Sequence, residues 1–510
     1  MIVKRENMSL KSTPTRKVLS LSIGLFLFSM ALRLFHLKNQ SLWLDEAVIF
    51  SQISKDSIYE VIASVEGHLG PFYHVLIFLF SKIAGTSEWA LRFPSAMFGS
   101  ISVVLTYLVA RKIFDDKLAL IASFFMMFSP IHIWYSQEAR MYSLWIMLIL
   151  LCTYVFMLAV EKSNLKRWLI FTICASCSIW TYLNSAFFFV GMFLFLLLQY
   201  KQYKKQIIIF SFCMTLVIAS FYPGIIAFLN KESMGIGSSR PTGIFDLAYA
   251  FLAFSFGTTF GPSLVEIRSL KNSLGTSAAL EQLVINYGTL LIPAIIAAIS
   301  LFIYSSIKLF KYHPDNQKLF FATMFITPAL AIFLIAYFAE SIPFNVRYML
   351  CALPFYYMLL ALGMKYLSGI FLPLSMILIF SIFGISLFNH YENNKYAKVE
   401  MNKAIAYASS HMKENDKSLI FYEHARVVLE YYDNTNKLKN SYVPLNGTLD
   451  SCKNMVKNAQ CVYFIQTIRT QQYPQKLISD TKSYFSKTFA TRRDIHFINA
   501  EINVFCNKKQ

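Results

Sequence analysis

The sequence predicts a polytopic α-helical membrane protein that ends in a small α/β domain. Of its 510 residues, 56% are hydrophobic and 15% are charged, whereas a soluble domain has about 25% charged residues. Apolar runs of the length that crosses a bilayer recur along the chain as far as residue 390. Residues 391–510 are polar and mixed instead, and short apolar strands alternate there with amphipathic helices.

The net charge of +19 is spread over short loops between the apolar runs. This distribution is typical of the positive-inside rule and argues against nucleic-acid binding, the usual explanation of a basic chain. Attraction to anionic headgroups or to phosphate-bearing substrates is a second interpretation of the same charge.

The first apolar run, residues 18–37, follows several Lys and Arg residues and has no small-residue cleavage site. We therefore expect an uncleaved helix and a cytoplasmic N-terminus over residues 1–16. About eleven spans are expected in all, the others at residues 91–112, 117–134, 143–161, 167–182, 183–200, 207–229, 284–309, 318–338, 347–365 and 368–389.

With these spans, the basic clusters fall in every second turn, so all of them lie on the same side of the membrane. Cytoplasmic turns then carry the bases Arg111, Lys112, Lys117, Lys162, Lys166, Arg167, Lys201, Lys204, Lys205, Lys308, Lys311 and Lys318. The membrane module covers residues 17–390 and has long outer loops at 38–90 and 230–283. Residues 391–510 form an extracytoplasmic domain.

Two apolar stretches are too short to span. Residues 71–84 are expected to form a re-entrant or interfacial helix, because counting them as a span would turn every later basic cluster outward. Residues 245–256, within the second outer loop, are expected to lie along the membrane interface.

The C-terminal domain is expected to contain helices at 399–412 and 426–432 and strands at 418–422, 462–466 and 502–506. Outside the cytoplasm its cysteines are free to oxidise, and Cys452–Cys461 is a plausible disulfide. The connectivity itself cannot be read from the sequence.

Adjacent carboxylates in the motif SLWLDEA lie just past the outer end of the first span. One of them, Asp45 or Glu46, is suited to act as a general base toward an attacking hydroxyl or amine. The alternative is a helix N-cap with Asp45 as the capping residue. His68, directly before the short helix at 71–84, is a candidate phosphate ligand or an interfacial histidine.

Two further outer segments carry ionisable groups. Glu138, Arg140 and Tyr142 lie in SQEARMYS, between two spans with almost no loop, which favours acceptor or sugar binding over a local ion pair. Arg347 and Tyr348 begin a later span, where the guanidinium is either a donor-phosphate contact or an interface anchor. All these candidates lie on the outer face in the predicted topology.

Several motifs in their order resemble those of the GT-C membrane glycosyltransferases. They are LWLDEA, HLGPFY, EWALRFPSAMFG, SPIHIWYSQEARMYSL and RYMLCALPFYYMLLALG. The branch they resemble is glycosyltransferase family 39-like, related to protein O-mannosyltransferases and to the aminoarabinose transferases that modify lipid A. The resemblance covers about residues 17–390.

The resemblance implies transfer of a sugar from a polyprenyl-phosphate donor to an extracytoplasmic lipid, glycan or protein acceptor, usually with inversion. It implies that Asp45, beside Glu46, is the catalytic acid of the first loop and that Glu138 is the acidic residue of the second. His68 and Arg347 correspond to donor-phosphate positions, although the usual His-Pro-Pro-Leu motif is His-Leu-Gly-Pro here.

No cofactor is implied. Some GT-C enzymes use a divalent cation with a richer acidic second loop, whereas this loop offers only Glu138, which favours metal-independent transfer. A plasma (inner) membrane location follows from the same resemblance. The alternative function is a transporter or lipid flippase, which would need repeat symmetry and charges at mid-membrane, and neither is evident in the sequence.

Overall fold

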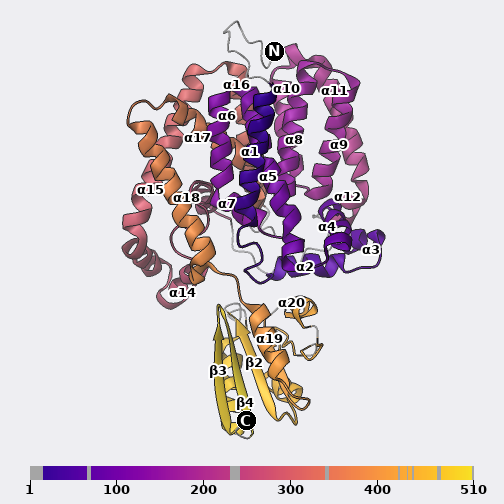
Figure 1. Cartoon of the computed structure of the whole chain (residues 1–510), viewed down its shortest axis with the longest axis vertical. Coiled ribbons are helices and arrows are strands. Elements are labelled where there is room, and N and C mark those ends of the chain that lie inside the picture. Colours follow the sequence, from indigo (N-terminus) through magenta and orange to yellow (C-terminus); the bar gives the residue numbers. More distant parts are fainter. Residues whose placement is uncertain are drawn as a thin grey trace. The chain divides into compact units, whose positions relative to one another are not determined.

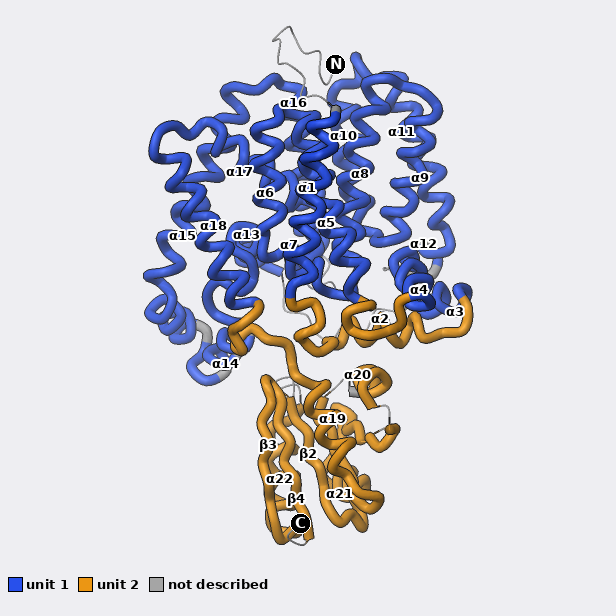
Figure 2. The backbone as a smooth tube through the Cα atoms, in the orientation of Figure 1, with its two compact units in different colours: residues 1–35, 58–83, 92–390 blue, residues 36–57, 84–91, 391–510 orange. Residues whose placement is uncertain are grey.

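A computed structural model describes residues 15–65, 70–229, 242–338, 344–422, 425–433, 435–438, 441–467 and 473–507. The chain divides into two compact units, coloured separately in Figure 2. Residues 1–35, 58–83 and 92–390 make up the first, here called the helical unit. Residues 36–57, 84–91 and 391–510 make up the second, the C-terminal unit, which therefore contains two pieces of the first predicted outer loop.

The helical unit is a bundle of long apolar helices (Figure 1). Its helices are α1 (Thr15–Leu34), α3 (Ile58–Ser64), α4 (Phe72–Ala84), α5 (Glu88–Ile113), α6 (Asp116–Phe128), α7 (Pro130–Ser136), α8 (Tyr142–Glu161), α9 (Leu165–Thr181), α10 (Ser185–Leu198), α11 (Tyr200–Ser220), α12 (Tyr222–Leu229), α13 (Ile244–Phe256), α14 (Leu264–Leu274), α15 (Thr276–Tyr312), α16 (Asp315–Phe338), η1 (Val346–Ala352), α17 (Leu353–Tyr366) and α18 (Phe371–Glu392).

The chain is a multi-pass membrane protein, as predicted. Within the described residues, eight helices are long and apolar enough to cross a membrane, or nine if the bent pair α6 and α7 is one span. Each predicted span falls on helical residues, but those at 117–134, 207–229 and 347–365 are each divided between two helices. Helices α9 and α10 have only 17 and 14 residues. The short apolar stretches are α4 and α13, with 13 residues each.

Polar contacts hold several of the predicted cytoplasmic turns together at one end of the helical unit. Lys112 Nζ lies 2.7 Å from the carboxylate of Glu161, joining the ends of α5 and α8. The Gln317 amide of α16 donates to the carbonyl of Ile113 at 2.7 Å. Figure 1 shows α4, α12 and α14 at the opposite end of the bundle from the start of α1.

The C-terminal unit is a three-layer α/β fold. Its elements are α2 (Leu44–Ile53), η2 (Asn394–Tyr396), α19 (Met401–His411), β1 (Lys417–Phe421), α20 (Ala425–Tyr432), α21 (Leu449–Met455), β2 (Cys461–Thr467), α22 (Gln475–Thr488), β3 (Thr491–Phe497) and β4 (Ala500–Cys506). The sheet has the order β1-β2-β4-β3, in which β1 and β2 are parallel and the other pairs antiparallel.

Alternate side chains of these strands enter two hydrophobic cores, one on each face of the sheet. Ile420 and Ile465 pack with α19 and α20, whereas Phe464 and Phe505 pack with α21 and α22. The predicted helices and strands are all present. Helices α21 and α22 were not predicted, and neither was β3, whose motif TRRDIHF carries the charges that are common on an edge strand.

The predicted disulfide was wrong. Cys461 is bonded to Cys506, and Cys452 is a buried free thiol in α21. Cys461 and Cys506 are paired directly across β2 and β4, where the side chains of opposed residues are neighbours. Cys452 enters the core on the other face of the sheet. The register of the strands, which the sequence does not reveal, therefore decides the pairing.

Candidate functional site

The two adjacent acids of the first loop have opposite surroundings. Helix α2 begins directly after Trp43, and Glu46 in its first turn reaches back to accept the backbone N–H of Trp43 at 3.3 Å. Lys398 Nζ lies 3.2 Å from the same carboxylate, whose side chain is fully buried. Asp45 is only half-buried. Glu46 therefore serves to cap the helix, and Asp45 is the more exposed of the two acids.

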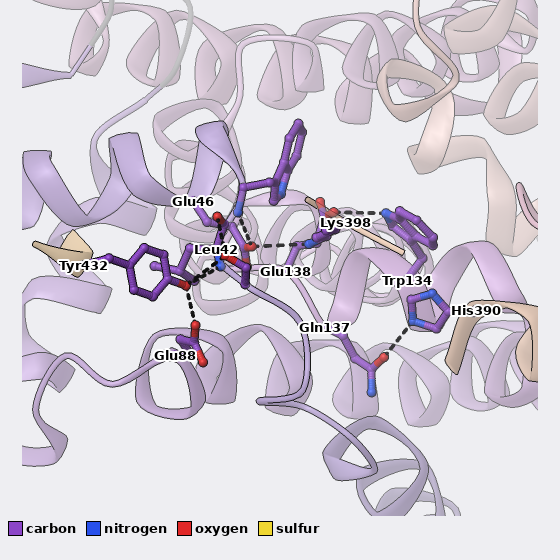
Figure 3. A network of polar contacts seen from close by, with 11 residues as sticks. Leu42, Glu46, Glu88, Trp134, Gln137, Glu138, His390, Lys398 and Tyr432 are labelled. Carbon is purple, nitrogen blue, oxygen red and sulfur yellow. Dashed lines mark hydrogen bonds and ion pairs between the residues drawn. The ribbon is translucent and has the colours of Figure 1, made fainter. Parts of the chain in front are cut away.

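Hydrogen bonds from distant parts of the C-terminal unit hold the start of this loop. The Tyr432 hydroxyl of α20 accepts the backbone N–H of Leu42 at 2.7 Å and donates to the Glu88 carboxylate (Figure 3). Burial, and then the hydrogen bond to Glu88, raise the pKa of Tyr432 well above its ordinary value. The hydroxyl therefore keeps its proton at physiological pH and remains a donor.

In the helical unit, the second predicted site follows a break between α6 and α7. Ser129 ends α6, caps α7 by accepting the N–H of His132, and is followed by Pro130, so the two helices bend by 58°. The fully buried guanidinium of Arg33 lies 2.7 Å from His132 Nδ1 and 3.4 Å from the carbonyl oxygens of Met126 and Met127. It thus supplies donors to carbonyls at the end of α6.

The turn after α7 is held on several sides. The Gln137 amide donates to the carbonyls of Arg33 and Phe35, and its oxygen lies 3.1 Å from His390 Nε2. Trp134 Nε1 donates to Glu138 at 3.0 Å, which orients that buried carboxylate (Figure 3). These contacts fix the backbone that presents Glu138 and the residues after it.

Two arginines from distant parts of the sequence meet at one tyrosine ring. The guanidinium carbons of Arg140 and Arg347 lie 5.9 Å and 5.8 Å from the centre of the Tyr142 ring. Arg347 also lies 5.5 Å from the ring of Tyr348. Tyr142 and Arg140 are buried, whereas Arg347 is half-buried. This arginine–tyrosine cluster concentrates positive charge where an anion could bind.

Aromatic side chains complete the walls of the arginine–tyrosine cluster. The ring of Tyr182, at the end of α9, lies 6.2 Å from that of Tyr142 and 6.4 Å from that of Tyr348. The ring of Tyr135 lies 5.1 Å from that of Tyr142. These tyrosines offer hydroxyls beside the paired cations.

The structure thus brings together Glu138, Arg140, Tyr142, Arg347 and Tyr348 within the helical unit, while Asp45 and Glu46 belong to the C-terminal unit. His68 lies outside the described residues. Four residues that contact the candidate site residues or their loops were not predicted, namely Arg33, Tyr182, Lys398 and Tyr432. Arg33 could have been predicted to have a special role, because it is a charged residue within the first apolar run. Nothing in the sequence singles out the other three, because contacts between distant segments give them their roles.

Among the residues that the structure describes, no group of three or more His, Cys, Asp or Glu side chains is arranged to hold a metal ion.

Comparison with known proteins agrees with this architecture. Residues 68–226 match the family model described as dolichyl-phosphate-mannose-protein mannosyltransferase. The chain is similar to the crystal structure of ArnT from Cupriavidus metallidurans bound to undecaprenyl phosphate, with 11% identity, a TM-score of 0.55, and coverage of 97% of this chain and 99% of that one. The chain has the GT-C glycosyltransferase fold.

The apo form of the same ArnT gives a similar result, with 12% identity, a TM-score of 0.54, and coverage of 97% and 98%. No curated protein sequence matches the chain. The predicted resemblance to the GT-C enzymes is confirmed. Within this GT-C fold, the segment that matches the family model contains Glu138, Arg140 and Tyr142, whereas Asp45 and Arg347 lie outside it.

Proposed function

We propose that this protein transfers a sugar from a polyprenyl-phosphate donor to an acceptor outside the cytoplasm, with inversion. The observation that carries the proposal is the arginine–tyrosine cluster, in which Arg140 and Arg347 flank one buried ring. Paired guanidinium groups suit the phosphate of such a donor, because their planar forks match phosphate oxygens. ArnT, a protein of the same fold, was crystallised with undecaprenyl phosphate.

In the proposed reaction, Asp45 takes the proton from the acceptor hydroxyl or amine as that group attacks the anomeric carbon. The bond between this carbon and the phosphate oxygen breaks, and the electron pair leaves with the polyprenyl phosphate. Arg347 and Arg140, with His68, stabilise the negative charge that develops on the departing phosphate. Glu138 and Tyr142 orient the sugar or the acceptor.

The proposed reaction does not require a metal, because guanidinium groups take up the charge that a divalent cation would otherwise neutralise. Transfer by the purified protein should therefore continue in excess EDTA. Loss of activity that added Mg²⁺ or Mn²⁺ restores would contradict this part of the proposal. The proposed location is the plasma (inner) membrane, with the N-terminus in the cytoplasm and the C-terminal domain outside.

The decisive experiment compares two isosteric variants in vesicles given a labelled undecaprenyl-phosphate sugar and an envelope extract as acceptor. Asp45→Asn should reduce transfer by about 100-fold or more, because no base remains at that position. Glu46→Gln keeps the shape of the first turn of α2 and should retain far more activity. Unchanged transfer by Asp45→Asn, or translocation of the lipid without any glycosylated product, would refute the proposal.

A further inference from the structure

The hydroxyl of Tyr432 joins segments that are far apart in the chain. It accepts hydrogen bonds from the N–H of Leu42 at 2.7 Å and from Ser41 Oγ at 3.3 Å. It donates a hydrogen bond to the carboxylate of Glu88. A phenol has one donor and can accept, so its hydrogen-bonding capacity is used fully here. Leu42 lies only three residues before Asp45, and Tyr432 ends α20, about 390 residues later.

Neighbouring contacts strengthen this connection. Tyr431 packs edge-on against Phe50 of α2, with ring centres 4.8 Å apart, and its hydroxyl donates to the carbonyl of Thr86 at 3.0 Å. Ala47, two residues after Asp45, is fully buried in the hydrophobic core that also contains Met401 of α19. Helix α2 is therefore packed into the interior of the C-terminal unit on one side.

A buried ion pair also joins α2 to the C-terminal domain. Glu46, adjacent to Asp45, has no exposed side-chain surface, and Lys398 is 12% exposed. Lys398 belongs to the segment that leads from α18 into α19, so the pair joins the start of α2 to the beginning of the domain. Contacts therefore hold the chain on both sides of Asp45, at the N–H of Leu42 and at the side chain of Glu46, and Asp45 itself is half-buried.

We propose that Tyr432 is a positioning residue, through which the C-terminal domain holds the Asp45 loop in the geometry that proton abstraction requires. This inference rests on the proposed function. The domain then sets the rate of the chemical step and does not serve only to bind the acceptor. A misplacement of about 1 Å in a general base is enough to slow a reaction by about 100-fold, so a single hydrogen-bond junction can control it.

The test uses the purified full-length protein and the variant Tyr432→Phe, with Tyr484→Phe as the control. Tyr484 is a partly buried tyrosine of the same domain that packs against the core on the far face of the sheet. Amide hydrogen exchange is measured over residues 41–53, and kcat and the donor KM are measured in vesicles. For Tyr432→Phe we expect exchange over 41–53 to be faster by about tenfold or more, because Leu42 N–H and Glu88 lose a half-buried hydrogen-bond partner.

In the same variant, kcat should fall by about tenfold and the donor KM should stay within about twofold, because the base is displaced while the donor phosphate site is untouched. Tyr484→Phe should change neither quantity. Glu88→Gln provides a second test if Tyr432→Phe folds poorly, since it weakens the same junction and leaves the tyrosine in place. It should change exchange over 41–53 and kcat in the same direction.

Unchanged exchange over residues 41–53 in Tyr432→Phe would overturn the proposed tether. Faster exchange with unchanged kcat would overturn the positioning role and leave the proposed transfer reaction intact. Absence of transfer by the wild-type protein would instead refute the proposed function, and the exchange measurement would still report whether Tyr432 tethers the loop.

Discussion

Asp45 and Glu46 are chemically similar neighbours that lie in different surroundings. Glu46 is buried against Lys398 and the N–H of Trp43, while Asp45 is half-buried. The cation and the backbone donor hold the buried carboxylate of Glu46 in place. This carboxylate contributes to the stability of the protein by capping α2 and by forming the ion pair. At Tyr142, by contrast, two cations, Arg140 and Arg347, lie near the same aromatic ring.

The buried pair leads to a prediction at the level of the residue. Lys398→Met should destabilise the protein by about 3 kcal/mol, because it leaves the charge of Glu46 buried without this cation. The double variant Glu46→Gln with Lys398→Met should recover a large part of the loss. Thermal unfolding of the full-length protein in detergent measures both. Lys413→Met is the control, since Lys413 is an exposed lysine of the same domain, and an equal effect there would contradict the prediction.

The break between α6 and α7 shows how an element of this fold positions the site. Carbonyl oxygens at the end of α6 have lost their helical donors, and in a membrane such groups must find partners within the protein. Arg33 reaches the carbonyls of Met126 and Met127 from α1, and the hydroxyl of Tyr357 donates to Ser129 at 2.7 Å. The bend then directs α7 toward the turn that carries Glu138.

In this arrangement Arg33 supports the bend with donors to the end of α6. Arg33→Met should lower stability by about 2 kcal/mol or more, because it removes donors from His132 and from buried carbonyls at once. Ser20→Ala, at an exposed position of the same helix, is the control. Thermal unfolding measures the loss. Equal melting temperatures for Arg33→Met and the wild type would show that other groups satisfy the broken end of α6.

The disulfide gives a second prediction for the elements of the C-terminal unit. Cys461 and Cys506 are 45 residues apart, so their bond restricts a large loop of the unfolded chain. Cys461→Ser should therefore destabilise the domain by about 3–4 kcal/mol under oxidising conditions. Cys452→Ser, which replaces a buried free thiol, should not alter the response to a reducing agent. The measurement is thermal unfolding with and without reductant, and insensitivity of the wild type would contradict the pairing.

At the scale of the whole molecule, the predicted topology places the basic clusters in cytoplasmic turns and the candidate site residues in outer loops. The Lys112–Glu161 pair and the Gln317–Ile113 hydrogen bond hold predicted cytoplasmic turns together. Such turns carry an excess of Lys and Arg because positive charges are retained on the cytoplasmic side during insertion.

The proposed topology can be tested by labelling with a membrane-impermeant thiol reagent in intact cells. The background protein keeps Cys461 and Cys506 and replaces the other cysteines. A cysteine introduced at the exposed position Lys413 should react from outside, whereas one at the exposed position Lys166 should react only after permeabilisation. Labelling of both from outside would refute the topology and, with it, the assignment of the site to the outer face.

The sequence by itself determined the fold class, the positions of the spans and the main strands of the C-terminal domain. These properties depend on hydrophobic runs and on local periodicity, which are encoded in consecutive residues. It also predicts Asp45, Glu138, Arg140 and Arg347 as candidate site residues, because ionisable groups are conspicuous in an apolar chain.

Only the tertiary structure decided which cysteine Cys461 pairs with, which of the adjacent acids is buried, and which distant residues contact Glu46 and Leu42. Strand register fixes the first, and contacts from Lys398 and Tyr432 fix the others. Such contacts join positions hundreds of residues apart, and they form only when packed elements bring those positions together. No local pattern around Lys398 or Tyr432 distinguishes them from other polar residues of the domain.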